Sequence, residues 1–128
     1  MECTQRLDYD SSESQRICPE QIGFLGILGS KYPVKHGPNK IGRDPQTCNI
    51  VLDLNSISRQ HAVINVLNDS EYMLMDLDSA NKTKLNNRIL RAYLPAPLRD
   101  GDTVQLGAVF GVFRLLRDAA LPTTQALP

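Results

Sequence analysis

The chain has no tryptophan, few aromatic residues and no surplus of charge of either sign, with 14 basic and 14 acidic side chains in 128 residues. Balanced charge argues against a nucleic-acid protein built on a broad basic surface, because counterion release requires an excess of lysine and arginine. No apolar run approaches the roughly 20 residues of a membrane helix, and the polar, acidic N-terminus is unlike a secretory signal. We therefore expect neither nucleic acid nor a membrane as a direct partner.

Cysteine is also scarce, and familiar enzyme signatures are missing. Cys3, Cys18 and Cys48 form no C-x-x-C pair and are odd in number, which disfavours a structural zinc site and favours reduced thiols in an intracellular protein. There is no G-x-S-x-G, P-loop or H-E-x-x-H sequence, and His36 and His61 are the only histidines. We predict no metal, no cofactor and no enzymatic activity.

The sequence does contain a series of short apolar segments separated by turn signals. Hydrophobic residues make up 41% of the chain, which suits one domain with a single core. Prolines recur too often for long helices, whereas alternation of apolar and polar residues, as in 61–67, is typical of strands. Turn signals include Asn86-Asn87 and the Asp-Gly-Asp sequence at 100–102. The sequence predicts an all-β sandwich or barrel with functional loops at one end. Strands are expected over residues 22–28, 49–52, 61–67, 72–77, 104–106 and 109–116, and a further short strand is expected to end at Ile41.

Both ends of the chain differ in composition from its middle. Residues 1–20 are polar and serine-containing, and we expect a flexible arm there; residues 118–128 are expected to be a flexible tail, leaving one domain over 21–117. The arm carries Thr4-Gln5, a dipeptide of the kind that checkpoint kinases phosphorylate, and Thr124-Gln125 is a second candidate. Two such pairs in a chain of this length are also compatible with chance.

Three polar clusters lie at the edges of expected strands, at 42–43, 58–61 and 81–83. Arginine, as at Arg43, offers a planar fork that matches phosphate oxygens, and serine hydroxyls can donate to the same oxygens. Asparagine, as at Asn81, can hold a peptide backbone through the donor and acceptor of its amide. Taken singly, each cluster is more often an ordinary turn than a binding site, and a lone histidine such as His61 at a strand start is more often a structural brace than a general base.

The order of the three clusters resembles the forkhead-associated (FHA) domain, in which Gly-Arg, Ser-x-x-His and Asn-x-Thr follow one another among short strands. The resemblance covers roughly residues 21–117 and implies a β-sandwich of about eleven strands that reads phosphothreonine peptides through loops at one edge. It implies that the pocket is supported by Gly42 and His61 and that the contacts to the phosphopeptide come from Arg43, Ser58, Arg59, Asn81 and Thr83; we include Lys82 among the expected contacts because it stands beside Asn81.

Lys82 departs from the family pattern, which usually has glycine after the asparagine. That glycine suits a turn with positive φ, a conformation that costs a lysine about 1 kcal/mol or more. Either this loop has a different shape, or Lys82 adds a positive charge near the phosphate.

Residues 1–5 and the stretch 56–62 also resemble an FHA-containing nuclear scaffold of the DNA-damage response, which implies a nuclear location. Thr4 is followed by the apolar Leu7 at +3, a position that FHA domains commonly select. We expect phospho-Thr4, formed by checkpoint kinases, to bind the pocket of a second copy and give a phosphorylation-dependent homodimer. Two alternatives stay open: a reader of a different phosphothreonine partner only, and a phosphate-independent interaction module that uses a sheet face.

Overall fold

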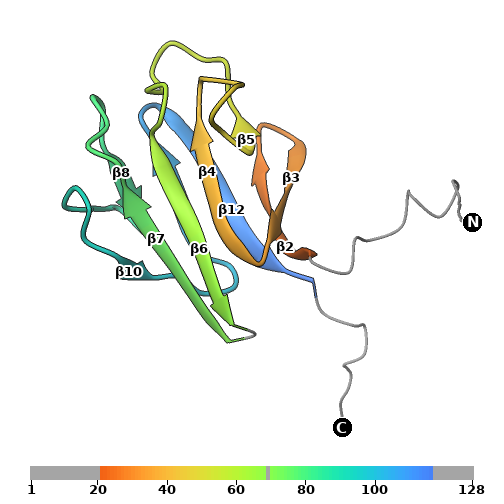
Figure 1. The fold of residues 1–128 in the computed structure, drawn as a ribbon. Coiled ribbons are helices and arrows are strands. Elements are labelled where there is room, and N and C mark those ends of the chain that lie inside the picture. The colour runs from red at the N-terminus through yellow and green to blue at the C-terminus, as the bar shows by residue number, and fades with distance from the viewer. Residues whose placement is uncertain (1–20, 69, 117–128) are drawn as a thin grey trace, which may run out of the picture.

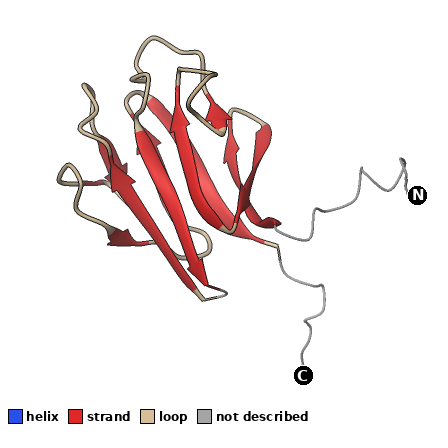
Figure 2. Ribbon diagram, in the orientation of Figure 1, coloured by secondary structure: helices blue, strands red, loops and turns tan. Residues whose placement is uncertain are grey.

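The computed structural model describes residues 21–68 and 70–116, so the expected arm (1–20) and tail (118–128) lie outside the described residues. The described part consists of eleven strands and no helix (Figure 2). Within it, accordingly, no helix is long and apolar enough to cross a membrane. The strands form two sheets that pack face to face (Figure 1), which confirms the predicted β-sandwich.

One sheet has five strands in the order β10-β7-β6-β4-β5. Its longest pair, β6 and β7, is antiparallel, with Ile64 opposite Leu74, whereas β5 runs parallel to β4. The strands are β4 Gly37–Gly42, β5 Ile50–Val51, β6 Ala62–Asn68, β7 Glu71–Asp76 and β10 Ala96–Pro97.

The other sheet has six antiparallel strands in the order β3-β2-β12-β11-β8-β9. A two-residue turn joins β8 to β9, and both of its residues, Asn86 and Asn87, have positive φ (49° and 73°), as a tight hairpin requires. This confirms the turn expected from the two asparagines. The strands are β2 Gln21–Ile27, β3 Ser30–Lys35, β8 Thr83–Leu85, β9 Arg88–Ile89, β11 Thr103–Leu106 and β12 Val109–Leu115.

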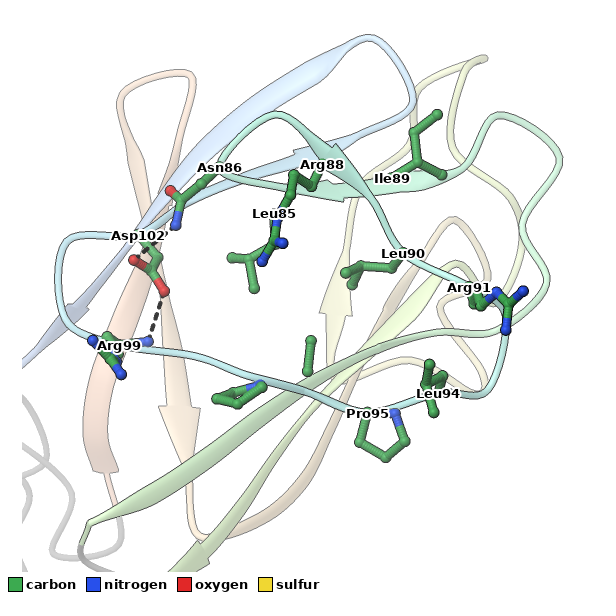
Figure 3. Close-up of a pocket in the computed structure, with 12 residues that line it drawn as sticks. Leu85, Asn86, Arg88, Ile89, Leu90, Arg91, Leu94, Pro95, Arg99 and Asp102 are labelled. Carbon is green, nitrogen blue, oxygen red and sulfur yellow. Dashed lines mark hydrogen bonds between the residues drawn. The ribbon is translucent and has the colours of Figure 1, made fainter.

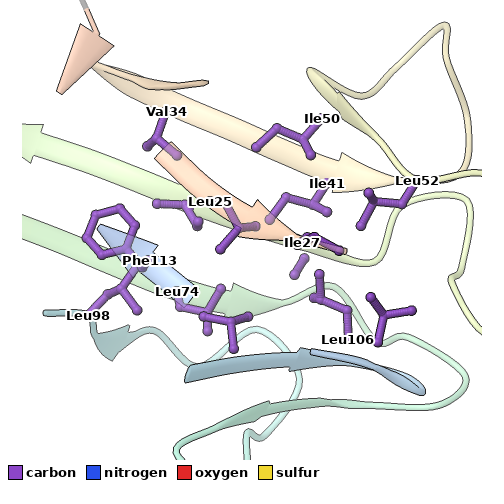
Figure 4. Close-up of a cluster of buried hydrophobic side chains, with 14 of the residues drawn as sticks. Leu25, Ile27, Val34, Ile41, Ile50, Leu52, Leu74, Leu98, Leu106 and Phe113 are labelled. Carbon is purple, nitrogen blue, oxygen red and sulfur yellow. The ribbon is translucent and has the colours of Figure 1, made fainter. Parts of the chain in front are cut away.

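The core lies between the two sheets and consists of the inward-facing side chains of both (Figure 4). In β12 the alternation is complete, because Val109 and Phe113 are buried while Phe110 and Val112 are exposed. Phe113 is fully buried and contacts the Tyr72 ring of the opposite sheet, with 5.7 Å between ring centroids. Burying a side chain of this size contributes about 1.5–3 kcal/mol, so the alternating pattern stabilises strands with one apolar face.

The strands expected from the sequence omitted β3, β8, β9 and β10, and placed only the end of β4. β3 and most of β4 were not recognised because each of these strands contains a proline. Pro33 lies on the edge strand β3, and Pro38 lies in the part of β4 that pairs with β6 alone. A missing backbone N–H is tolerated at such places. The first strand also ends earlier than expected, because Leu28 (φ 52°) belongs to the turn before β3.

Candidate functional site

Three loops meet at one end of the sandwich, at the top of Figure 1: residues 43–49 after β4, 52–61 before β6, and 77–82 between β7 and β8. Backbone hydrogen bonds join the first two loops. The N–H of Arg43 donates to the carbonyl of Ser58 at 3.0 Å, and the N–H of Asp44 donates to the carbonyl of Arg59 at 3.2 Å. The first two polar clusters of the sequence are thereby held side by side.

Gly42, the last residue of β4, is buried beneath the junction of these two loops. A Cβ atom at this position would lie 2.1 Å from the carbonyl oxygen of Arg59 and 2.8 Å from Sγ of Cys48. Both distances are far inside van der Waals contact, so only glycine allows the strand to pass this close to the second loop. Gly42 therefore allows β4 to pass directly beneath the junction of the two loops.

Ser58 is half-buried and joins the second loop to the third. Its hydroxyl oxygen accepts a hydrogen bond from the backbone N–H of Ala80 at 3.0 Å. A hydroxyl that already accepts keeps its own O–H as a donor. Ser58 can therefore offer that O–H to an anionic oxygen at the loop surface.

His61 is completely buried and braces the same two loops from below. Its Nδ1 accepts a hydrogen bond from the backbone N–H of Ser58, and its Nε2 lies 3.0 Å from the carbonyl oxygen of Lys82. Because a carbonyl only accepts, Nε2 carries the proton and the ring is neutral. Burial lowers the pKa of His61, against the opposing effects of the Lys82 hydrogen bond and the Asp76 charge. Both ring nitrogens are occupied, which is the arrangement of a structural brace.

Lys82 has a φ of 72°, so the third loop keeps the left-handed turn that glycine usually provides in the family. Its carbonyl oxygen accepts the hydrogen bond from His61 and another from the N–H of Gly107, at 3.0 Å. Its side chain is exposed beside Asn81. The lysine is therefore accommodated without a change in the shape of the loop, which was one of the two alternatives that the sequence left open.

Asn81 is exposed at the tip of the third loop. Its Nδ2 donates to the carbonyl oxygen of Ser56 at 3.0 Å, and the hydroxyl of Ser56 in turn accepts from the backbone N–H of Ala108 at 3.1 Å. The hydrogen bond to Ser56 orients the Asn81 amide, and in the described part of the chain no residue donates a hydrogen bond to its Oδ1. An acceptor and a second donor stay available for an extended peptide.

Thr83 was expected to contact the phosphopeptide through its hydroxyl or its backbone, and the structure shows that its hydroxyl does not reach the loop surface. The residue is fully buried, and its hydroxyl donates to Oδ1 of Asp76 at 2.6 Å. The hydroxyl and backbone N–H of Ser79 donate to the same carboxylate. This buried cluster supports the third loop from within. The sequence analysis missed Asp76 and Ser79, although an aspartate at a strand end followed three residues later by serine is typical of such a turn.

The surface beside these loops is cationic. A hollow of about 400 Å³ is lined by Arg43, Asp44, Pro45, Gln46 and Arg59. The Asp44 carboxylate accepts hydrogen bonds from the N–H of Gln46 and from the Thr47 hydroxyl, both at 3.0 Å, and these bonds hold its pKa below the usual value. Within residues 21–68 and 70–116 no carboxylate lies within 4.0 Å of either guanidinium, although the charge of Arg59 also lowers the pKa of Asp44. The same residues contain no cluster of histidine, cysteine and carboxylate side chains that could hold a metal ion.

Comparison with known proteins relates the chain to a known family. The family model described as "FHA domain" matches residues 39–107, a range that contains all three polar clusters. Human mediator of DNA damage checkpoint protein 1 is 32% identical to the chain over 140 residues, which covers 95% of this chain and 7% of that protein. The chain therefore spans only a small part of the length of this relative.

Solved structures of similar fold point the same way. A structure from an analysis of phosphothreonine-dependent FHA domain interactions superposes with a TM-score of 0.67 at 29% identity, covering 75% of this chain and 98% of that one. The MEK1 FHA domain in complex with a phosphothreonine peptide of HOP1 superposes with a TM-score of 0.65 at 30% identity, covering 74% and 97%.

Proposed function

Because the chain belongs to the FHA domain family, whose members are phosphothreonine-peptide readers, we propose that its three loops bind a phosphothreonine peptide. The observation that carries the proposal is the convergence of Arg43, Ser58 and Asn81 from three separate loops onto one end of the sandwich. Such a module binds a partner and performs no catalysis.

Each residue would contribute a distinct contact to the bound peptide. The guanidinium of Arg43 and the hydroxyl of Ser58 would donate to phosphate oxygens, with Arg59 and Lys82 adding positive charge. The amide of Asn81 would hold the peptide backbone next to the phosphothreonine through its Oδ1 and its remaining N–H. Gly42 and His61 would act only by keeping the loops in place.

Calorimetric titration of the unphosphorylated chain tests this function. The titrant is a peptide of residues 1–10, either phosphorylated on Thr4 or not. We expect binding of the phosphorylated peptide at micromolar concentration and none of the unphosphorylated form. Equal binding of both forms would show that the interaction does not depend on the phosphate. Binding of neither form would mean that the phosphothreonine ligand belongs to another protein.

The physiological ligand, we further propose, is phospho-Thr4 of a second copy of the chain. About 17 residues separate Thr4 from the first strand at Gln21, and at up to ~3.4 Å each they can reach either the chain's own pocket or a neighbour's. A reciprocal exchange fills two identical pockets with two-fold symmetry, and the second contact gains from a high effective concentration. This would be a homodimer that forms only after a kinase has acted on Thr4-Gln5.

Two complementary variants distinguish exchange between copies from binding within one copy. The first carries phospho-Thr4 and Arg43→Ala, and the second carries Thr4→Val and an intact pocket. We expect each to sediment as a monomer at tens of micromolar and the mixture to contain a 1:1 complex, because only the mixture offers both an arm and a pocket. If the singly phosphorylated, intact chain itself stays monomeric at that concentration, the dimer proposal fails while the reader function can still hold.

The cellular setting follows from the relative rather than from the fold. Similarity to mediator of DNA damage checkpoint protein 1 supports a role in a nuclear scaffold that acts in the DNA-damage response, with kinases of Thr-Gln sites upstream. A fluorescent fusion would be expected to concentrate in the nucleus and to gather at damaged DNA. Diffuse cytoplasmic signal before and after damage would contradict this setting.

A phosphate-independent interaction through a sheet face is the second candidate. The observation in its favour is the outer face of the six-stranded sheet, where Phe110 is 57% exposed and Val112 is 38% exposed on β12. Binding through this face would survive Arg43→Ala and be lost on Phe110→Ser. Binding through the loops would show the opposite pattern.

A further inference from the structure

A groove lies on the open side of the sandwich, between the edge strands β9 and β10 of the two sheets. The edge strand β9 pairs only with β8 and the edge strand β10 pairs only with β7, and the segment 90–95 crosses from one to the other. The groove encloses about 620 Å³. Figure 3 shows Leu85 and Leu90 directed into it, with Arg99 near one end and Arg91 near the other.

The lining of the groove combines apolar walls with three arginines. The apolar walls consist of Leu85, Ile89, Leu90, Leu94, Pro95, Ala96 and Pro97. The arginines are Arg88, Arg91 and Arg99, and the other polar lining residues are Asn86 and Asp102. Ile89 is 62% exposed and Leu94 is 55% exposed. Apolar side chains this accessible beside cationic groups suit a ligand that carries both apolar and acidic residues.

The three arginines have no anionic partner in the described structure. All three are exposed, and among residues 21–68 and 70–116 no carboxylate forms an ion pair with Arg88, Arg91 or Arg99. The carboxylate in the groove, Asp102, is already used, since it accepts from Nδ2 of Asn86 at 3.1 Å and from the backbone N–H of Arg99 at 2.8 Å. The groove thus presents a local excess of positive charge on a chain whose overall charge is zero.

We propose that the groove binds residues 7–13 of the chain's own N-terminal arm. This segment reads Leu-Asp-Tyr-Asp-Ser-Ser-Glu and contains three carboxylates and no basic residue. Three carboxylates match three guanidinium groups, and Leu7 and Tyr9 supply apolar groups for the walls. The site is separate from the three loops, and its occupation does not require phosphorylation.

The arm is long enough to reach the groove from the start of β2. Eight residues lead from Glu13 to Gln21 and span up to ~27 Å when extended. Leu115 pairs with Gly23 near the start of β2, and its backbone N–H donates to Asp100, the residue after Arg99, at 2.9 Å, so the Arg99 end of the groove lies within this reach. Tethering also places the segment at an effective concentration of millimolar order, so individually weak surface contacts suffice.

The cationic hollow beside Arg43 is a poorer site for this segment. Its lining contains the Asp44 carboxylate and no leucine, isoleucine or aromatic side chain. The arm's carboxylates would meet two arginines there rather than three, and Leu7 and Tyr9 would stay in water. The groove offers both kinds of contact together.

Amide chemical shifts of the unphosphorylated chain of residues 1–128 test the proposal without altering the folded domain. The test variant neutralises the arm with Asp8→Asn, Asp10→Asn and Glu13→Gln. We expect the amide resonances of residues 85–99 to move relative to the parent chain, and to move in the same direction when NaCl is raised to about 0.5 M. The control variant, Arg6→Gln with Arg16→Gln, alters arm charges outside the segment and should leave residues 85–99 unchanged.

The reverse experiment alters the groove and observes the arm. With Arg88→Gln and Arg91→Gln, the amide shifts of residues 7–13 should move to those of a free peptide of residues 1–20. Lys31→Gln with Lys35→Gln removes the same charge elsewhere and should not have this effect. The proposal is overturned if the arm of the parent chain already has the free-peptide shifts. It is also overturned if the arm variant moves only residues 43–59 and 77–82, which would assign the carboxylates to the loops instead.

Discussion

Nε2 of His61 donates a hydrogen bond to the carbonyl oxygen of Lys82 at 3.0 Å, while the other ring nitrogen accepts from the N–H of Ser58. One buried ring therefore connects the loop that carries the serine with the loop that carries Asn81. Lys82, whose carbonyl accepts this bond, adopts a φ of 72°. The loops that would bind phosphate are held from below by a residue that itself has no exposed surface.

The first prediction concerns the pH dependence of stability. Burial lowers the pKa of His61 below the ordinary value of 6.5, and the unfolded chain regains that ordinary value. Between the two values the unfolded state binds more protons, so stability is fully present above pH 6.5 and falls as the pH is lowered through this range. One histidine contributes a slope of at most ~1.4 kcal/mol per pH unit. Urea unfolding between pH 7.5 and 5.5 measures the slope.

A direct titration by NMR accompanies this measurement. The His61 ring should titrate below 6.5. A ring that titrates at or above 6.5 would contradict the prediction, because protonation would then not oppose folding.

The second prediction concerns Lys82. Replacing it with glycine should raise the free energy of unfolding by about 0.5–1 kcal/mol, because glycine adopts a φ of 72° without the steric cost that an L-residue bears. The side chain is exposed, so its removal loses no core packing. Lys84→Gly, two residues further along in β8, should lower stability instead. Chemical denaturation compares both variants, and a loss of stability in Lys82→Gly would show that the lysine side chain itself stabilises the loop.

The third prediction concerns the close passage of β4 beneath the loops. Gly42→Ala should lower the free energy of unfolding by about 1–3 kcal/mol, since the new Cβ would lie 2.1 Å from the carbonyl oxygen of Arg59. Gly26→Ala is the matched control, because its Cβ would meet no atom closer than 3.8 Å. Thermal unfolding of the two variants gives the comparison, and equal melting temperatures would contradict the crowding at Gly42.

The fourth prediction concerns affinity for the phosphorylated peptide of residues 1–10. Arg43→Ala should weaken binding by about 2–5 kcal/mol, the usual cost of removing one partner of a charge-assisted contact. Arg114→Ala removes an exposed arginine whose side chain lies 3.8 Å from Asp100, away from the loops, and should bind like the parent chain. Calorimetry measures the affinity of both variants. An unchanged affinity in Arg43→Ala would show that the phosphate binds at another site.

Much of the fold could be read from the sequence, because alternation of apolar residues reports directly on which face of a strand is buried. The β12 pattern and the Asn86-Asn87 hairpin are examples of such local information. β3 and β4 were harder to recognise, because prolines within them argue against a strand unless the pairing partners are known. β9 and β10 are only two residues long, too short for any periodicity to show.

For the candidate site, the sequence by itself determined which residue types occur, including Gly42, and in which order they follow one another, because the three polar clusters are local patterns. Only the tertiary structure decided how they are used. Thr83 points inward to Asp76, His61 joins two loops, and Lys82 adopts a glycine-like turn. The groove beside Arg88 likewise exists only because the edges of two sheets meet. These relations depend on contacts between residues far apart in the chain, and no local pattern encodes such a distance.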